Sequence, residues 1–211
     1  MNTFSTCVVL LLVMRFGGAL CACGCPLCKK TPSREAAVAT CAQLNETTLI
    51  GYTAVNGDNS LCYFDSTNDV TDFYNADNWC KSMLSYTNAN GEVKHGRLAR
   101  VPTQAVLDDL YNTLSVAAMD NTTSHWHWIG LRQFERTAGP NENWYWVDET
   151  GAADGAMVDV PGTIPWAENE PNNLPGSTIY GDCAALDTAK DKLIDYPCNN
   201  RFRYFCEVDT V

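Results

Sequence analysis

Apolar residues in the first half of the chain recur at helical spacing in two segments. The stretch 71–86 predicts a helix with an inner face that includes Phe73, Cys80, Met83 and Leu84, with Asp77 opposite. Thr103 is a residue type that caps helices, and a second apolar series follows it: Val106, Leu107, Leu110, Tyr111 and Leu114. The pattern therefore predicts two amphipathic helices.

Beyond Asn121 the helical period disappears, and short apolar and aromatic runs alternate with Gly-, Asn- and Pro-rich segments. These runs predict strands at 126–131, 144–147, 183–186 and 203–207, and residues 98–101 predict a short buried strand or turn before Pro102. Two helices followed by several short strands favour an α+β fold over an alternating α/β sheet. Residues 151–180 carry few regular signals, and a loop of that length is usually functional or disordered.

The N-terminus resembles a secretory signal peptide. An apolar run, CVVLLLVM from Cys7 to Met14, is too short to span a bilayer and is followed by the small residues Gly17, Gly18 and Ala19. We expect a signal over residues 1–19, with cleavage after Ala19 or Ala22. No later stretch is long enough to cross a membrane, so we expect a secreted, extracellular protein without a transmembrane anchor.

Composition agrees with secretion and excludes one class of partner. Eleven cysteines in 211 residues indicate an oxidising compartment, and a net charge of −11 argues against nucleic-acid binding because phosphate backbones would be repelled. Four of the cysteines crowd a short arm at residues 20–40, namely Cys21, Cys23, Cys25 and Cys28. Disulfides within or between chains are the ordinary interpretation, with a metal cluster as the alternative. Bridges between chains would give disulfide-linked oligomers. Asn45 and Asn121 begin glycosylation sequons.

Four motifs in register resemble the C-type lectin-like domain family. They are Trp128-Ile-Gly-Leu131, Asn143-Trp-Tyr-Trp-Val-Asp148, Glu170-Pro-Asn172, and the cysteine frame Cys183, Cys198 and Cys206-Glu207. The resemblance covers residues 41–208 and leaves a tail at 209–211. It implies two helices packed on short antiparallel strands with a long loop region. It also implies the disulfides Cys80–Cys206 and Cys183–Cys198, and a long-form bridge Cys41–Cys62.

The same resemblance assigns a binding site. Glu-Pro-Asn in this family accompanies calcium and sugars of the mannose, glucose or fucose type, with a cis bond before the proline. It implies that Glu170, Asn172 and Asp195 contact both the sugar and Ca²⁺. A hydroxyl oxygen would coordinate calcium, accept from the Asn172 amide and donate to the Glu170 carboxylate.

Two positions depart from the family pattern. Gly181 and Ile194 stand where the family usually has calcium ligands, and neither side chain carries an oxygen. The segment between Glu170 and Cys183 is longer than usual, so Asp182 is a substitute metal ligand, and Asp187 and Asp191 are also close in sequence. The expected calcium affinity is consequently weak.

Other constellations give weaker hypotheses. His125 and His127 have strand spacing but lack a third metal ligand. The acidic positions Asp148, Glu149, Asp154 and Asp159 are candidates for an auxiliary calcium site, with a solvated acidic loop as the ordinary interpretation. Nothing singles out a catalytic acid and nucleophile, so an enzyme is not expected. We expect a lectin that binds glycans or glycoproteins in innate recognition. The alternatives are a calcium-independent protein-binding module on the same scaffold and an acidic matrix-associated protein.

Overall fold

The structure, a computed structural model, describes part of the 211-residue chain. The described residues are 41, 50–53, 61–66, 69–110, 125–134, 139–155, 164–173, 182–189 and 191–210. All of them fall within one unit, Thr31–Val211. The expected signal peptide, the cysteine-rich arm, Asn45, Asn121, Asp159 and Gly181 lie outside the described residues.

Nine of the described strands form one sheet, and two more form a separate hairpin. The main path runs β1 (Ile50–Thr53), β2 (Leu61–Asp65), β11 (Arg203–Asp209), β6 (Trp126–Gln133), β7 (Trp144–Val147) and β8 (Ala153–Asp154). Off this path, β5 (Arg97–Leu98) pairs with β11, and β9 (Asp182–Asp187) joins β6 to β10 (Lys192–Pro197). The hairpin consists of β3 (Ser85–Thr87) and β4 (Val93–His95). The expected antiparallel pairing holds except between β11 and β6, which are parallel, so the sheet is mixed.

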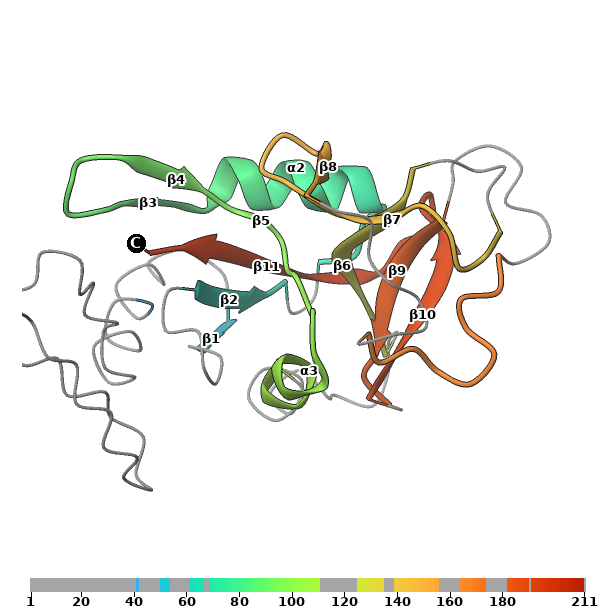
Figure 1. The fold of residues 1–211 in the computed structure, drawn as a ribbon. Coiled ribbons are helices and arrows are strands. Elements are labelled where there is room, and N and C mark those ends of the chain that lie inside the picture. The colour runs from blue at the N-terminus through green and yellow to red at the C-terminus, as the bar shows by residue number, and fades with distance from the viewer. Residues whose placement is uncertain are drawn as a thin grey trace, which may run out of the picture. The chain divides into compact units, whose positions relative to one another are not determined.

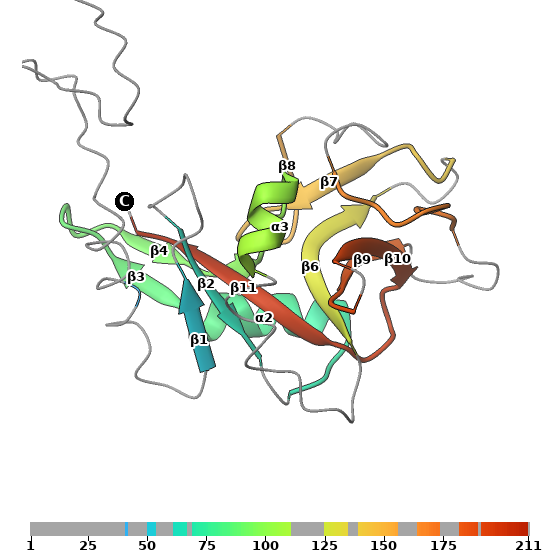
Figure 2. The ribbon, with the colours of Figure 1, turned by 90° about the horizontal axis from the view of Figure 1, so that it is seen from below.

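Two helices lie on opposite sides of strand β11 (Figures 1 and 2). Helix α2 (Phe73–Met83) begins after Asp72, whose carboxylate accepts the Asn75 backbone N–H at 3.0 Å. Helix α3 (Gln104–Leu110) follows Thr103, whose hydroxyl oxygen accepts from the Val106 backbone N–H, as the sequence predicts. Both helices and the α+β class are thus confirmed, while Tyr111 and Leu114 lie outside the described residues.

The inner face of α2 differs from the prediction at two positions. Asp77, expected on the outer side, is buried and forms an ion pair with Lys81, four residues along the helix. Met83, expected inside, is 47% exposed. The helix ends at Met83 and the chain turns into an extended conformation at Leu84, so Leu84 takes the buried position instead.

Three disulfides connect the elements around the core, as the resemblance implies. Cys80–Cys206 joins α2 to β11, Cys183–Cys198 closes the end of the β9–β10 hairpin, and Cys41–Cys62 ties an upstream residue to β2. All six cysteines are buried. Trp128 lies fully buried between the sheet and α2, where its indole packs edge-on against Phe73 at 5.9 Å between ring centroids.

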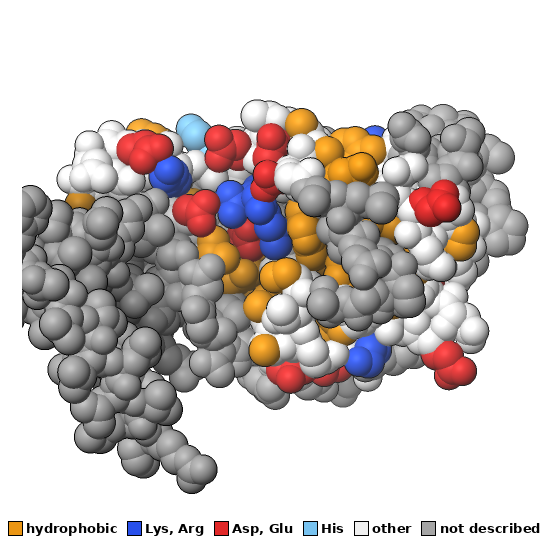
Figure 3. All heavy atoms as spheres, viewed as in Figure 1, with side chains coloured by type: hydrophobic (Ala, Val, Ile, Leu, Met, Phe, Trp, Pro, Cys, Tyr) orange, Lys and Arg blue, Asp and Glu red, His pale blue; other side chains and the backbone are white. Residues whose placement is uncertain are grey.

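A buried charged cluster connects β5 to β11. The Glu207 carboxylate, which is fully buried, accepts from Arg97 Nε at 2.7 Å and from the Arg100 backbone N–H at 2.9 Å. Burial raises the pKa of Glu207, and the two arginines oppose that rise. Arg100 also pairs with Asp154 on β8 at 2.6 Å. Figure 3 shows basic side chains bordered by acidic ones on this face of the molecule.

Candidate functional site

The segment that precedes the Glu-Pro-Asn motif is anchored along strand β10. The Leu193 backbone N–H donates to the Pro165 carbonyl at 2.9 Å, and the Ala167 N–H donates to the Leu193 carbonyl at 2.8 Å. The Trp166 ring packs against the buried Trp144, with 5.1 Å between ring centroids. These contacts place the residues that follow beside Asp195, two positions along β10.

The motif itself forms a tight turn. The Glu170–Pro171 peptide bond is cis, as the resemblance implies, and Pro171 is buried. Asn169 and Asn173 flank the turn with φ angles of 64° and 51°. Asparagine tolerates this left-handed backbone conformation better than most residues, which explains why an Asn-rich sequence can turn here without glycine.

Asp195 holds the turn through both of its carboxylate oxygens. Oδ1 accepts the Asn172 backbone N–H at 2.6 Å, and Oδ2 accepts the Asn173 backbone N–H at 2.8 Å. The Asp195 side chain is almost fully buried, at 1% exposure. Because each bond has an ionised acceptor, the pair is stronger than two neutral hydrogen bonds.

The side chains of Glu170 and Asn172 meet at the protein surface. The Asn172 amide nitrogen donates to Glu170 Oε1 at 2.8 Å; Asn172 is exposed and Glu170 is half-buried. One carboxylate acceptor therefore stands next to one amide that can both donate and accept. Such a pair has the chemistry to bind hydroxyl groups, which donate and accept in the same way.

Asp182 and Ile194 lie on opposite faces of the β9–β10 hairpin. Asp182 pairs with Pro197 and Ala184 pairs with Asp195, so the two aspartates lie diagonally on one face of the hairpin. Both are buried. Ile194 lies on the other face and packs in the hydrophobic core, so its side chain fills space there instead of approaching the turn.

The donor set resembles that of a calcium site in kind but not in number. Glu170, Asn172 and Asp195 offer only oxygen ligands, which suits a hard cation, whereas calcium takes six to eight oxygens. Both Asp195 oxygens already accept backbone N–H groups. In the described part of the chain, no three His, Cys, Asp or Glu side chains converge as a metal-binding group. The residues thus fit calcium in ligand type and provide an incomplete coordination shell.

The structure separates the other sequence-based candidates. His127 is buried and stacks on Phe205 at 4.4 Å between ring centroids, whereas His125 is exposed. Asp148 accepts backbone N–H groups within its own turn, and Asp154 pairs with Arg100. Among the described residues, no contact joins these two histidines or these two aspartates to the Glu170 turn.

Two other acidic candidates also have local partners. Asp187 accepts the Ala189 backbone N–H at 3.0 Å. Asp191 lies 3.4 Å from the side-chain nitrogen of Gln104 on α3. Burial, and then the neighbouring Asp108, raise the pKa of Asp191. The contacts of these two aspartates stabilise the end of the β9–β10 hairpin.

A groove along α2 was not expected from the sequence. It is lined from the helix by Asn75, Asn78, Trp79 and Ser82. The signal was present as a polar stripe at positions i, i+3, i+4 and i+7, which places four side chains on one face of a helix. A single tryptophan within that stripe is the unusual feature.

Comparison with known proteins gives a consistent result. A family model for the lectin C-type domain matches residues 69–208. The mouse protein C-type lectin domain family 4 member K is 34% identical over 82 residues, a match that covers 38% of this chain and 21% of the mouse protein. The chain therefore spans about a fifth of the length of that curated relative.

Solved structures share the fold at lower sequence identity. Human lithostathine superimposes with a TM-score of 0.52 at 23% identity, over 76% of this chain and 98% of that chain. CEL-I from Cucumaria echinata, a C-type lectin, gives a TM-score of 0.53 at 18% identity, over 77% and 97% of the two chains. Among the described residues, no helix combines the length and apolar character needed to cross a membrane.

Proposed function

The chain belongs to the C-type lectin domain family, and from this premise we propose that it is a carbohydrate-binding lectin whose site is formed by Glu170, Asn172 and Asp195. A C-type lectin domain is a non-enzymatic binding module. The proposal extends to secretion and to glycans or glycoproteins as partners, because the apolar N-terminal run and the eleven cysteines favour an extracellular protein.

One observation carries the proposal: the continuous hydrogen-bonded arrangement from Asp195 to the surface. Asp195 fixes the backbone of Asn172, and the Asn172 side chain then pairs with Glu170 at 2.8 Å. A buried carboxylate thereby positions a half-buried acceptor and an exposed amide. Because their positions are already set, little conformational freedom is lost when hydroxyl groups bind.

We assign the site to sugars of the mannose, glucose or fucose type. The order of acceptor and donor, Glu170 before Asn172, is the order that the family resemblance associates with those sugars. Calcium, when bound, would supply a cation that attracts hydroxyl oxygens, and Glu170, Asn172 and Asp195 would hold it, with Asp182 on the same face of the hairpin as Asp195. Calcium binding should be weak because these residues supply few oxygen ligands.

A glycan array probed with and without chelator tests the proposal. Glu170→Ala removes the acceptor that Asn172 contacts, and a charged hydrogen bond contributes about 1.5–3 kcal/mol, so affinity for mannose-type glycans should fall about tenfold or more. Glu168→Ala is the matched control, because Glu168 is exposed and only two residues away. It should bind like the wild type.

The double change Glu170→Gln with Asn172→Asp tests the sugar class. It exchanges the positions of the carboxylate and the amide while keeping the net charge, so mannose-type binding should weaken. Glycan binding that survives Glu170→Ala unchanged, on a folded protein, would move recognition elsewhere. An array without any glycan signal would favour the calcium-independent protein-binding module.

A further inference from the structure

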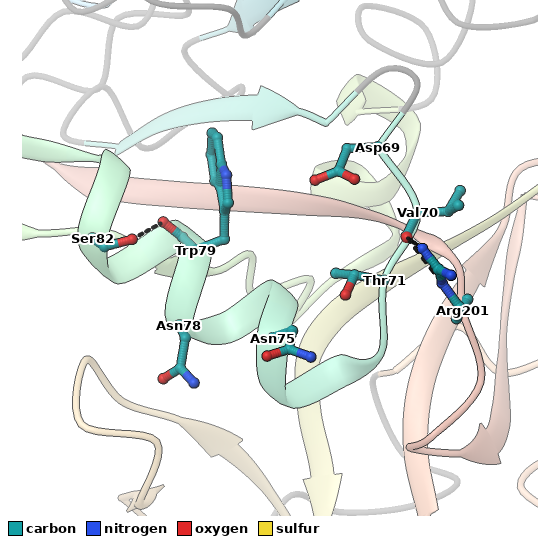
Figure 4. A pocket seen from close by; sticks show the side chains of 8 residues that line it. All are labelled: Asp69, Val70, Thr71, Asn75, Asn78, Trp79, Ser82 and Arg201. Carbon is teal, nitrogen blue, oxygen red and sulfur yellow. Dashed lines mark hydrogen bonds between the residues drawn. The ribbon is translucent and has the colours of Figure 1, made fainter.

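The outer face of α2 borders an open groove of about 590 Å³. Asn75, Asn78, Trp79 and Ser82 line it from the helix, and the segment Asp69–Thr71 together with Arg201 lines it from the other side. In Figure 4, Trp79 and Asp69 stand on the same side of the helix, and Ser82 and Arg201 lie toward opposite ends. The volume lies within the range of small-molecule sites.

One buried residue positions both Trp79 and Asp69. The Tyr204 ring packs edge-on against Trp79, with 5.7 Å between ring centroids, and its hydroxyl donates to Asp69 Oδ2 at 3.0 Å. Tyr204 is fully buried. Burial, and then the bond to Asp69, raise the pKa of Tyr204, so its hydroxyl stays protonated and keeps donating.

Hydrogen bonds also hold the side of the groove opposite the helix, which consists of Asp69–Thr71 and Arg201. Arg201 donates to the Val70 carbonyl from Nε at 3.3 Å and from Nη2 at 2.9 Å (Figure 4). The Thr71 backbone N–H donates to the Phe202 carbonyl at 2.9 Å, and the Thr71 carbonyl accepts the Trp128 indole N–H at 3.0 Å. The groove is therefore preformed, and a ligand would not need to order it.

Several groups that line the groove have polar atoms available to a ligand. Within the described part of the chain, the Asn78 amide, the Thr71 hydroxyl and the Trp79 indole N–H form no hydrogen bond. Asp69 uses one carboxylate oxygen for Tyr204 and keeps the other. The groove thus combines one half-buried aromatic ring with donors and acceptors of hydrogen bonds.

We propose that this groove is a second carbohydrate subsite, which takes one neutral pyranose residue of a glycan. The apolar C–H face of a pyranose suits the indole of Trp79, whose ring face is electron-rich. Its hydroxyl groups suit Asn78 and Thr71, which can both donate and accept, and Asp69, whose carboxylate accepts. Arg201 directs two of its N–H groups to the Val70 carbonyl, and the Asp69 carboxylate would repel an anion, so the lining favours a neutral ligand over an anionic one.

The subsite shares no residue with the Glu170 turn, so an experiment can refute one of the two proposed sites and leave the other standing. The test uses the ¹⁵N-labelled full chain with EDTA, titrated with maltotriose, mannotriose and lactose while the tryptophan indole N–H resonances are followed by NMR. The chain has six tryptophans, and Trp79→Phe assigns the Trp79 signal by its disappearance. We expect a saturable shift of that signal with at least one of the sugars.

Variants decide where the sugar binds. Asn78 is exposed, so Asn78→Ala should leave the fold intact and weaken binding about threefold to tenfold, the effect of one neutral hydrogen bond. Asn141→Ala, the same change on an exposed turn outside the groove, should have no effect. Glu170→Ala should also leave the Trp79 shift unchanged. The proposal is wrong if no sugar shifts the Trp79 indole, if Asn78→Ala binds like the wild type, or if Glu170→Ala removes the shift.

Discussion

Replacement of Asp195 by Asn should release the Glu170–Asn173 turn while the domain stays folded. The wild-type carboxylate accepts two backbone N–H groups, from Asn172 at 2.6 Å and from Asn173 at 2.8 Å. An Asn side chain offers one acceptor oxygen and turns its own N–H groups toward the second donor. At least one bond is therefore lost.

The magnitude follows from the charge on the acceptor. A hydrogen bond to a charged group contributes about 1.5–3 kcal/mol, so the backbone amide that loses its partner should exchange with solvent about tenfold to hundredfold faster. Hydrogen–deuterium exchange followed by NMR measures this directly at Asn172 and Asn173. Affinity for mannose-type glycans should fall in parallel, since the turn positions Glu170 and Asn172.

Asp148→Asn is the matched control. Asp148 accepts the backbone N–H groups of Thr150 and Ala152 in a separate turn, so this change should accelerate exchange there and leave Asn172 and Asn173 unaffected. The reasoning would be refuted if the two Asn amides already exchange at the rate of an unstructured peptide in the wild type. It would also be refuted if Asp195→Asn left their exchange and glycan binding unchanged.

Two further predictions concern stability. Burial raises the pKa of Asp77 above its ordinary value of 3.8, so its contribution to stability is complete below that pH and is lost as the pH rises through the folded-state pKa. Asp77→Asn should therefore flatten the decline of the unfolding free energy above about pH 4, measured by denaturant titration across a pH series; an unchanged slope would contradict it. Glu207→Ala leaves the buried Arg97 with only Asp209, at 3.2 Å, and removes the acceptor of the Arg100 backbone N–H, so it should cost about 3–5 kcal/mol in the same assay at neutral pH. A loss no larger than that of an exposed Glu149→Ala control would argue against the buried pair.

The sequence predicts the elements whose burial follows a simple period. Strands β6 and β7 contain dense aromatic and aliphatic runs, and both helices show apolar spacing, so their positions agree with the structure within a few residues. Strand β10 was not predicted because its sequence, KLIDYP, carries a buried charge among apolar residues. Asp195 can be buried there only because Asn172 and Asn173, more than twenty residues away, provide its partners.

The residues of the candidate site could be identified from the sequence because they belong to a recognisable motif. The resemblance to the C-type lectin-like family implies a site at Glu170, Asn172 and Asp195, and the structure brings these three residues together. The i, i+4 spacing of Asp77 and Lys81 on α2 can be seen in the sequence, but the burial of Asp77 cannot. The groove at Trp79 depends on Tyr204 and Arg201 from the far end of the chain, and the polar stripe on α2 does not reveal these tertiary partners.

The disulfides also decide how the domain would transmit mechanical tension. Force applied at the two ends of the chain would pass through the Cys41–Cys62 bridge, along the backbone to Cys80, and through the Cys80–Cys206 bridge into the last residues. The backbone from 81 to 205, which contains the Glu170 turn and Asp195, lies outside this covalent path. Tension on the two ends would thus stretch only a short segment and would not load the proposed binding turn. The turn would therefore keep its geometry, and its ability to bind a glycan, while the chain is under tension.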